Sequence, residues 1–421
     1  MHALCFLDPG HFHAALTLRE GNPLVDDEIF VYAPDRPELA EFLKLIDAFN
    51  RRSERPTDWR VTVRAGERSL DRLIADRPGD VVVLAGRNDV KLALMRRLHD
   101  AGFHVLADKP WLTKPEAIDH ARQVLGSGPV AFEIMTGRHE ITSILAQRIV
   151  RDRDVFGEFD ADSDPAIRLA SVHHLEKTVN GAPLRRPPWY FDVRVQGEGL
   201  ADIPTHLVAE AQRLLAAHGR ATDRELTLVD AKLSATSVPL ALFRRVTGLA
   251  EFPHELDTRV ESERLNYFGN AELTFRLRDV GVAVSTRWDL APPPESGDTH
   301  SALLVGTRAG VRIEQGLHTG FQRRVVIEPR GDADRVRAAL QDLVAAAQRD
   351  YPGLAIGPAP RGFEMQIPAT LRTGHESHFP LVLAECLRTI DTGRFPDERA
   401  AETLAKYELL ARALASARSL A

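Results

Sequence analysis

This sequence has few cysteines, no long apolar runs and nearly equal numbers of basic and acidic residues. The only cysteines are Cys5 and Cys386, both among apolar neighbours. They offer no disulfide framework and fit buried free thiols in a reducing cytoplasm. No apolar stretch approaches the length that crosses a membrane. The N-terminus also lacks the basic start, apolar run and cleavage site of a signal peptide. We therefore expect a cytoplasmic protein with no membrane partner.

The charge balance gives no reason to expect nucleic acid as a partner. The formal net charge is −6, and no run of like charges stands out among the 27% of charged residues. With 44% hydrophobic residues, the composition is typical of a soluble globular protein. A chain of 421 residues is too long for one ordinary core. We expect two domains.

The pattern of apolar residues changes about a third of the way along the chain. Over about the first 135 residues, short apolar segments alternate with amphipathic helical stretches, which predicts an α/β fold with a doubly wound parallel sheet. Beyond that point strand-like segments follow one another across short turns, which predicts an α+β domain with a large, mostly antiparallel sheet. We place the two domains at residues 1–136 and 137–421.

A strand is predicted over residues 4–7, and the turn after it has few glycines for a phosphate-binding turn. Compared with G-x-G-x-x-G, only Gly10 remains, while Asp8 stands in the first position and His13 in the third. A strand, tight turn and helix present backbone N–H groups to a phosphate, so Gly10, His11, Phe12 and His13 are candidates for cofactor binding. Alternatively, one glycine marks only a turn, and an acid at position 8 repels a pyrophosphate unless its side chain points away.

An acidic residue follows the second strand, which is predicted over residues 29–33. Asp35 lies at the distance at which an acid can bind the adenosine ribose of a dinucleotide. Alternatively, it caps the next helix. Arg36 is able to accept a 2′-phosphate, whereas Asp35 resists one, so the choice between NAD and NADP stays open.

A lysine stands at the end of the strand predicted over residues 103–106. Asp108, Lys109 and Pro110 leave this strand at its carboxyl end, which is where ligands bind in an open α/β sheet. The alternative is an ordinary strand exit with a solvated lysine. Further along the chain, Asp202 and His206 are four residues apart at the start of a predicted helix. On one helix face the carboxylate can orient the imidazole for acid–base chemistry; otherwise Asp202 is an N-cap and His206 a surface histidine.

Two motifs together resemble one enzyme family. Residues 101–110 read A-G-F-H-V-L-A-D-K-P and residues 199–206 read G-L-A-D-I-P-T-H. They are similar to A-G-x-H-V-x-x-[DE]-K-P and G-x-L-x-D-x-x-x-H of the Gfo/Idh/MocA oxidoreductases, such as glucose–fructose oxidoreductase and inositol dehydrogenase. The glycine of the second motif falls directly before the leucine in this chain, one residue closer than the pattern, and the resemblance extends to about residue 390.

The resemblance implies a Rossmann-like dinucleotide-binding domain followed by a domain for substrate binding and oligomerisation. It implies an NAD- or NADP-dependent dehydrogenase of a sugar, cyclitol or related polyol, and a homo-oligomer, either dimer or tetramer. His206 would be the base, Lys109 would hydrogen-bond the reacting oxygen and bind substrate, and Asp202 would orient His206 or bind substrate. Asn88, Asp108 and Lys109 would lie near the cofactor. Two alternatives are a lyase or glycosidase that retains its NAD and a non-catalytic ligand-binding protein.

Other polar and aromatic residues are candidates for the substrate site. His173, His174 and Glu176 raise the question of a metal site, but adjacent strand residues point to opposite faces, so we expect no metal. Trp189 either stacks on a sugar or packs the domain junction, and His375 either lines the pocket or caps a helix. The predicted substrate-binding residues are Lys109, Arg138, His174, Lys177, Trp189 and His375.

Overall fold

The computed structural model describes residues 1–179, 182–219, 226–293, 297–393 and 397–419. These form two compact units, described one at a time below. Unit 1 comprises residues 1–137, 194–197 and 374–407, and unit 2 comprises residues 138–193, 198–373 and 408–421. The division predicted from the sequence places residues 374–407 with the second domain, whereas they cluster with the first.

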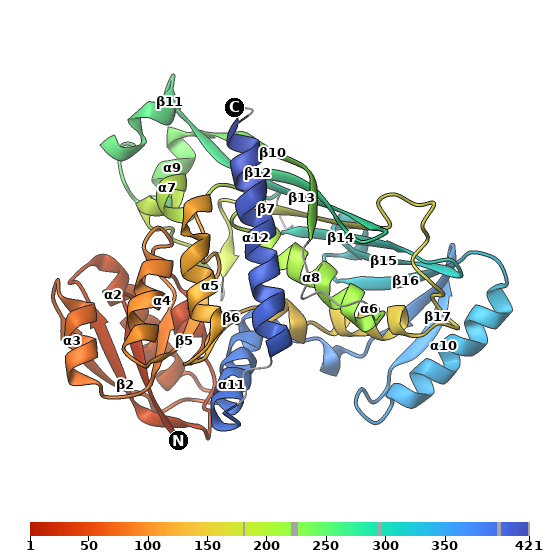
Figure 1. Cartoon of the computed structure of the whole chain (residues 1–421), viewed down its shortest axis with the longest axis horizontal. Helices are drawn as coiled ribbons and strands as arrows, with labels where there is room; N and C mark the ends of the chain where they lie inside the picture. Colours follow the sequence, from red (N-terminus) through yellow and green to blue (C-terminus); the bar gives the residue numbers. More distant parts are fainter. Residues whose placement is uncertain (180–181, 220–225, 294–296, 394–396, 420–421) are drawn as a thin grey trace. The chain divides into compact units, whose positions relative to one another are not determined.

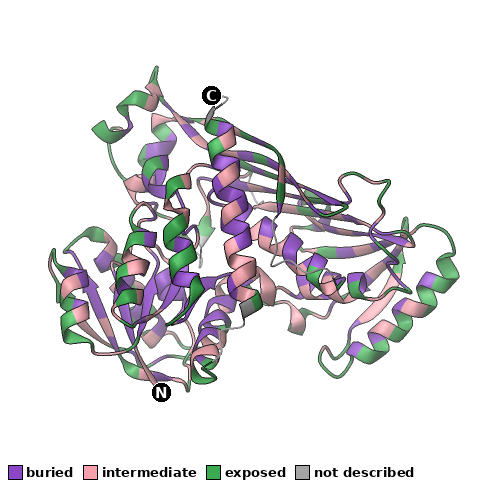
Figure 2. Ribbon diagram, viewed as in Figure 1, coloured by how far each residue is buried: buried purple, intermediate pink, exposed green. Residues whose placement is uncertain are grey.

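Unit 1 is built on a six-stranded parallel sheet with the order β3-β2-β1-β4-β5-β6 (Figure 1). This confirms the predicted doubly wound sheet. The strands at its centre are apolar and buried, as expected where helices cover both faces; β4 reads V-V-V-L and is buried throughout (Figure 2). The strands are β1 (His2–Leu7), β2 (Val25–Ala33), β3 (Arg60–Ala65), β4 (Val81–Leu84), β5 (His104–Asp108) and β6 (Ala131–Ile134).

The helices of unit 1 come from both ends of the chain. The last helix that packs into its core, α11, adds Phe379, Val382 and Leu383 to the buried cluster and contacts α1, β5 and β6. The helical segments are α1 (His13–Leu16), α2 (Pro37–Arg51), α3 (Ser69–Asp76), α4 (Lys91–Asp100), η1 (Pro115–Ala117), α5 (Ile118–Gly126), η2 (Thr136–His139), α7 (Val193–Gln196), η7 (His375–Ser377), α11 (His378–Asp391) and the first part of α12 (Asp397–Ser419). Among the described helices, none combines the length and apolar character needed to cross a membrane.

Unit 2 is built on a ten-stranded sheet in which β7 and β13 are parallel and the other paired strands antiparallel. The mostly antiparallel sheet is as predicted. Its order is β10-β12-β13-β7-β14-β15-β16-β18-β17, with β11 beside β12. The strands are β7 (Ile167–His174), β10 (Thr227–Pro239), β11 (Val260–Glu261), β12 (Arg264–Leu277), β13 (Val280–Asp289), β14 (Thr299–Val305), β15 (Ala309–Gln315), β16 (Arg324–Pro329), β17 (Ala355–Ala359) and β18 (Gly362–Gln366).

Helices cover the sheet of unit 2, and buried side chains alternate along its strands. In β12 nearly every second residue is buried, which is typical of a strand with one face on the core. Helices α6 and α8 pack on each other, and α8 also packs on β7 and β13. The helices are α6 (Ile141–Arg151), η3 (Pro188–Phe191), α8 (Pro204–Ala217), α9 (Leu240–Thr247), η4 (His254–Arg259), η5 (Leu317–Thr319), α10 (Ala333–Ala347) and η6 (Ala369–Leu371); β8 (Thr178–Val179) and β9 (Ala182–Pro183) form a separate pair.

Candidate functional site

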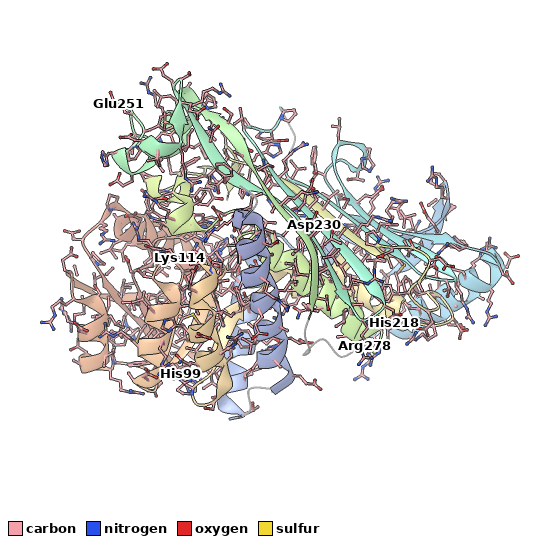
Figure 3. All side chains as sticks on the ribbon, turned by 45° about the horizontal axis from the view of Figure 1, so that its top comes forward. His99, Lys114, His218, Asp230, Glu251 and Arg278 are labelled. Carbon is pink, nitrogen blue, oxygen red and sulfur yellow. The ribbon has the colours of Figure 1, made fainter. Side chains whose placement is uncertain are left out.

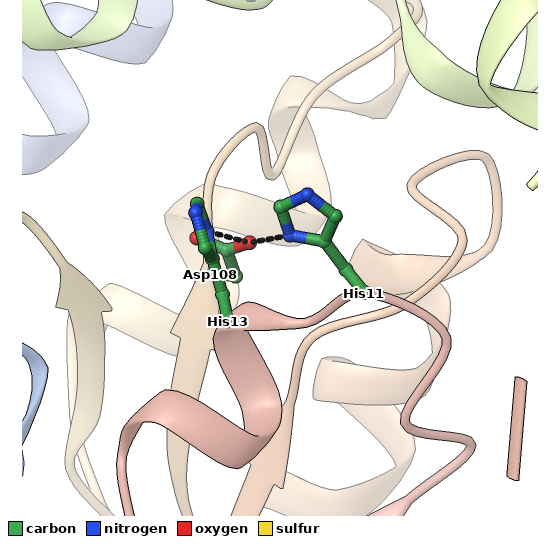
Figure 4. A group of neighbouring side chains, drawn as sticks. All are labelled: His11, His13 and Asp108. Carbon is green, nitrogen blue, oxygen red and sulfur yellow. Dashed lines mark hydrogen bonds and ion pairs between the residues drawn. The ribbon is translucent and has the colours of Figure 1, made fainter. Parts of the chain in front are cut away.

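Two histidines and one aspartate meet at the carboxyl edge of the sheet in unit 1 (Figure 4). His11 and His13 come from the turn after β1, and Asp108 is the last residue of β5. Oδ2 of Asp108 lies 3.1 Å from Nδ1 of His11 and 2.9 Å from Nδ1 of His13. Asp108 is only 3% exposed. The structure thus joins three of the predicted cofactor-binding residues in one group, called here the His–Asp cluster.

The charge of the His–Asp cluster resides on Asp108. Burial alone would raise the pKa of this carboxyl, but its charge interaction with His13 and the hydrogen bonds from both imidazoles hold it well below its usual range. Burial lowers the pKa of His11 to about 3, and repulsion by His13 adds to this effect. An ionised carboxylate therefore faces an uncharged His11 at neutral pH.

A histidine from the far end of the chain lies beside this cluster. The ring of His375 in η7 is 6.2 Å from that of His13, centroid to centroid, and Phe379 packs against both rings. Nε2 of His375 is 3.1 Å from Oγ1 of Thr136. The structure thus places His375, predicted to bind substrate, within unit 1 and next to His13.

The backbone on both sides of Lys109 is held in place. Lys109 is half-buried, and its own N–H donates to Oδ1 of Asp108 at 3.0 Å. Two residues further on, the buried ring of Trp111 stacks on Tyr407 with centroids 5.5 Å apart, and the backbone N–H of Trp111 donates to the Tyr407 hydroxyl at 3.1 Å. Tyr407 in turn donates to the buried carboxylate of Glu133. This anchoring restricts where the Lys109 side chain can reach.

A second lysine, Lys91, binds the backbone of this segment, a role that was not predicted from the sequence. Lys91 is 2% exposed, and its ammonium group donates to Oδ1 of Asn88 at 2.5 Å and to the carbonyls of Asp108 and Pro110 at 2.7 and 3.1 Å. Nδ2 of Asn88 donates to the carbonyl of Gln196 at 2.9 Å. Lys91 therefore ties the loop after β4 to the end of β5. In the sequence it is an ordinary polar residue at a helix start, so nothing there signals its burial.

The turn between β1 and α1 contains a single glycine, Gly10, and packs on the loop after β4. Asp8 has a left-handed backbone, with φ of 45°, which glycine adopts freely and aspartate tolerates. A Cβ on Gly86 would lie 2.4 Å from the carbonyl oxygen of Asp8, so glycine is needed where the loop after β4 packs on this turn. The N–H groups of Gly10 and His11 both donate to the carbonyl of Ala85, at 3.1 and 2.9 Å. Those two donors are therefore used within the protein.

Two further N–H groups at the start of α1 fit a phosphate. Within the part of the chain that the structure describes, those of Phe12 and His13 donate to no backbone carbonyl. Arg36 lies 3.9 Å from the carboxylate of Asp8 and opposes the rise that burial causes in its pKa. Together with the strand order, these features fit a dinucleotide held by fewer backbone donors than the full fingerprint supplies. Asp35 is exposed, and Arg36 occupies the cap position of α2, so the alternative that Asp35 caps this helix is wrong.

In unit 2 the second predicted motif lies where α8 begins. Asp202 is 2% exposed, and its carbonyl accepts hydrogen bonds from the N–H and Oγ1 of Thr205, at 3.3 and 2.6 Å. His206 is half-buried in the first turn of the helix. The cap residue is Ile203, so the alternative that Asp202 is the N-cap is wrong. A buried carboxylate one turn before a histidine remains the geometry expected of an acid–base pair.

A close backbone approach explains the glycine of this motif. The N–H of Gly199 donates to the carbonyl of Phe268 in β12 at 2.8 Å. A Cβ at this position would lie 2.6 Å from the carbonyl oxygens of Gly269 and Asn270. Glycine directly before Leu200 is thus required by the contact with β12, which accounts for its shifted place in the motif.

Asp298, which was not predicted from the sequence, binds three candidate residues of unit 2: His174 and Lys177, predicted to bind substrate, and His173, weighed as a metal ligand. It accepts hydrogen bonds from Nδ1 of His173 at 3.0 Å, Nδ1 of His174 at 3.2 Å and Nζ of Lys177 at 3.0 Å. Burial alone would raise the pKa of Asp298, but the His173 hydrogen bond and the charge of Lys177 hold it far below its usual range. The expectation that the adjacent histidines point apart is wrong here, because both rings turn to the same carboxylate at the end of β7.

The remaining predicted substrate residues lie elsewhere in unit 2. Arg138 is half-buried at the point in η2 where unit 2 begins, and Trp189 is half-buried in η3. Trp189 packs against an apolar cluster that includes Tyr190 and Trp288, and Arg186 lies 4.5 Å above the Tyr190 ring. These contacts favour a packing role for Trp189.

Comparison with known proteins places the chain in a family. Residues 145–418 match the family model described as "Putative oxidoreductase C terminal domain". The chain belongs to this family. A "putative oxidoreductase" from Parabacteroides merdae is 34% identical, with all of this chain and 98% of that one covered and a TM-score of 0.93. No curated protein is similar enough in sequence to match.

More distant members of the fold have been solved with nicotinamide cofactors. Levoglucosan dehydrogenase, in complex with NADH and levoglucosan, is 16% identical over all of this chain and 97% of its own, with a TM-score of 0.61. GenD2 from gentamicin A biosynthesis, in complex with NAD, is 15% identical over all of this chain and 95% of its own, with a TM-score of 0.62. The predicted resemblance to the Gfo/Idh/MocA oxidoreductases is confirmed.

Proposed function

We propose that the protein is an NAD- or NADP-dependent oxidoreductase that moves hydride between a nicotinamide and a secondary hydroxyl of a sugar, cyclitol or related polyol. The observation that supports this most is the order β3-β2-β1-β4-β5-β6 in unit 1, because this order is typical of dinucleotide-binding sheets. The N–H groups of Phe12 and His13 and the carboxylate of Asp35 would hold the cofactor. When bound, the nicotinamide accepts or donates the hydride.

The chain's own residues would handle the proton and the substrate oxygen. Lys109 would hydrogen-bond the reacting oxygen, and the anchoring of its backbone by Asp108 and Trp111 supports a fixed position for it. His206 would take the hydroxyl proton, and the buried carboxylate of Asp202 would orient it or bind a neighbouring hydroxyl. The proposal includes a cytoplasmic location, which the buried free thiols of Cys5 and Cys386 support. It also includes a homo-oligomer, either a dimer or a tetramer.

A spectroscopic assay tests the proposal. The purified protein would be incubated with NAD⁺ or NADP⁺ and a panel of aldoses, anhydrosugars, cyclitols and amino sugars, and formation of reduced nicotinamide followed by its absorbance. On any substrate found, Lys109→Ala and His206→Ala should each lower kcat/KM by about 10²–10⁴-fold. Lys114→Ala and His318→Ala serve as matched controls, because both residues are exposed (Lys114 is labelled in Figure 3).

The other outcomes separate the alternatives. Full turnover in both variants would show that Lys109 and His206 do not have these roles. A changed sugar product with no net reduced nicotinamide would indicate a lyase or glycosidase that retains its NAD. Sugar binding without any turnover would indicate a ligand-binding protein.

A further inference from the structure

We propose that His11, His13 and Asp108 form a binding site for one divalent transition-metal ion of the zinc type. Each of the three residues offers one ligand atom, and these atoms all lie within 4.8 Å of one another. They come from two separate strand ends of one sheet, so the grouping is a product of the fold and not of neighbouring positions alone. The proposal does not depend on the function proposed above.

The spacing of the donor atoms suits an ion. The two measured separations, from Oδ2 of Asp108 to Nδ1 of His11 and of His13, are 3.1 and 2.9 Å. With metal–ligand bonds of about 2.0–2.1 Å, the ligand atoms of a tetrahedral zinc site are about 3.3 Å apart. The two Oδ2–Nδ1 separations are within about half an ångström of this value, and the two Nδ1 atoms lie within 4.8 Å of each other, so the side chains can close on an ion by adjusting their own positions.

The types of donor select the class of metal. Two imidazole nitrogens and one carboxylate oxygen form a ligand set that zinc and neighbouring transition metals accept, whereas calcium and magnesium prefer oxygen ligands throughout. Three protein ligands leave one tetrahedral position open, as in catalytic sites, for water or for an oxygen of a bound ligand.

The surroundings hold the ligand atoms ready. Oδ1 of Asp108 accepts the N–H of Lys109 at 3.0 Å, which fixes the carboxylate and leaves Oδ2 facing the two rings (Figure 4). The ring of His13 packs at 4.5 Å from that of Phe379, which limits its rotation. Outer contacts of this kind orient metal ligands and strengthen binding. Little conformational freedom remains to be lost when an ion binds.

Binding also requires the protons to be accounted for. In the structure both Nδ1 atoms face Oδ2 as hydrogen-bond donors. To bind an ion, each neutral imidazole keeps one proton but carries it on Nε2, so that Nδ1 offers its lone pair. The ligand set of His11, His13 and Asp108 then carries one negative charge, and a divalent ion reverses it to one positive charge. The ion would favour an anionic oxygen in the open position.

Metal titration of tag-free, chelator-stripped protein, with no dinucleotide present, tests the proposal. Equilibrium dialysis against buffered Zn²⁺, followed by elemental analysis, should give one ion per chain. Co²⁺ should give the intense visible absorption of a four-coordinate site, and X-ray absorption of the zinc-loaded wild type should show imidazole ligands. His13→Ala and Asp108→Asn should each weaken Zn²⁺ binding by more than about 100-fold.

A matched control is available on the same unit. His2→Ala removes a surface His–Asp pair with the same chemistry, 3.0 Å between Nε2 of His2 and Oδ1 of Asp391, and should leave Zn²⁺ binding unchanged. Equal Zn²⁺ binding by wild type and His13→Ala would overturn the proposal, as would a wild type that binds no ion or lacks imidazole ligands in its absorption spectrum. The last two readouts use only wild-type protein, so misfolding of a variant cannot obscure the answer. Failure here would leave hydride transfer untouched.

Discussion

Replacing Lys91 with methionine should destabilise unit 1 and loosen the segment that carries Lys109. The ammonium of Lys91 supplies three hydrogen bonds, to Asn88 and to the carbonyls of Asp108 and Pro110. Each buried acceptor left without a donor costs about 1–3 kcal/mol. Relief from burying an ammonium offsets part of this, since such burial costs several kcal/mol. We expect a net loss of about 2–4 kcal/mol in the free energy of unfolding of unit 1.

Urea unfolding with a local probe measures this loss. Trp59 and Trp111 are the tryptophans of unit 1, and the fluorescence of Trp111 reports the segment in question. Hydrogen exchange should also become faster at the amides of Lys109 and Trp111. Lys114→Met is the control, because Lys114 is exposed. If Lys91→Met unfolds within about 0.5 kcal/mol of that control, the reasoning about buried acceptors is wrong.

Three further predictions concern Asp298, Gly86 and Tyr407. Because the folded pKa of Asp298 is lowered, its ionised form stabilises unit 2 fully above the unfolded pKa of about 3.9, and this stabilisation is lost as the pH falls towards the folded value. The gap in unfolding free energy between wild type and Asp298→Asn should therefore be constant from pH 7 to about 5 and narrow below about 4; a gap that widens in acid would contradict this. Gly86→Ala, whose Cβ would meet the Asp8 carbonyl, should cost about 1–3 kcal/mol in urea unfolding, and no loss would show that the turn yields freely. Tyr407→Phe removes the hydrogen bonds to Glu133 and Trp111 and should cost about 2–3 kcal/mol by the same measurement, with an unchanged midpoint as the contrary result.

Local patterns in the sequence predict most of the fold. The apolar runs at β4 and β6 and the helical stripe of α2 each bury the residues that their periodicity indicates. Helix ends are less predictable. The sequence T-K-P-E at Thr113 to Glu116 resembles a capping box, yet a 3-10 turn begins at Pro115 and no side chain caps α5. Proline at the first helical position shifts the start of the helix.

The site is less predictable than the fold, because it depends on contacts between residues that are distant in the sequence. The sequence points to His11, His13 and Asp108 one by one, but not to their meeting, since 95 residues separate the last two. Asp298 follows a proline-rich loop and carries no motif, although it gathers two histidines and a lysine. The burial of Lys91 depends on carbonyls at positions 108 and 110 that only the folded sheet brings near. Local periodicity carries no information on these long-range contacts, which are seen only in the folded structure.

A titration with nicotinamide dinucleotides tests the central claim, that unit 1 serves an NAD- or NADP-dependent oxidoreductase. Protein shown by denaturation and absorbance to be free of co-purified dinucleotide would be titrated with NAD⁺, NADH, NADP⁺ and NADPH by calorimetry. We predict saturable binding of at least one of them, near one per chain, or else a dinucleotide that co-purifies. Dinucleotide-free protein that binds none of the four would contradict the account.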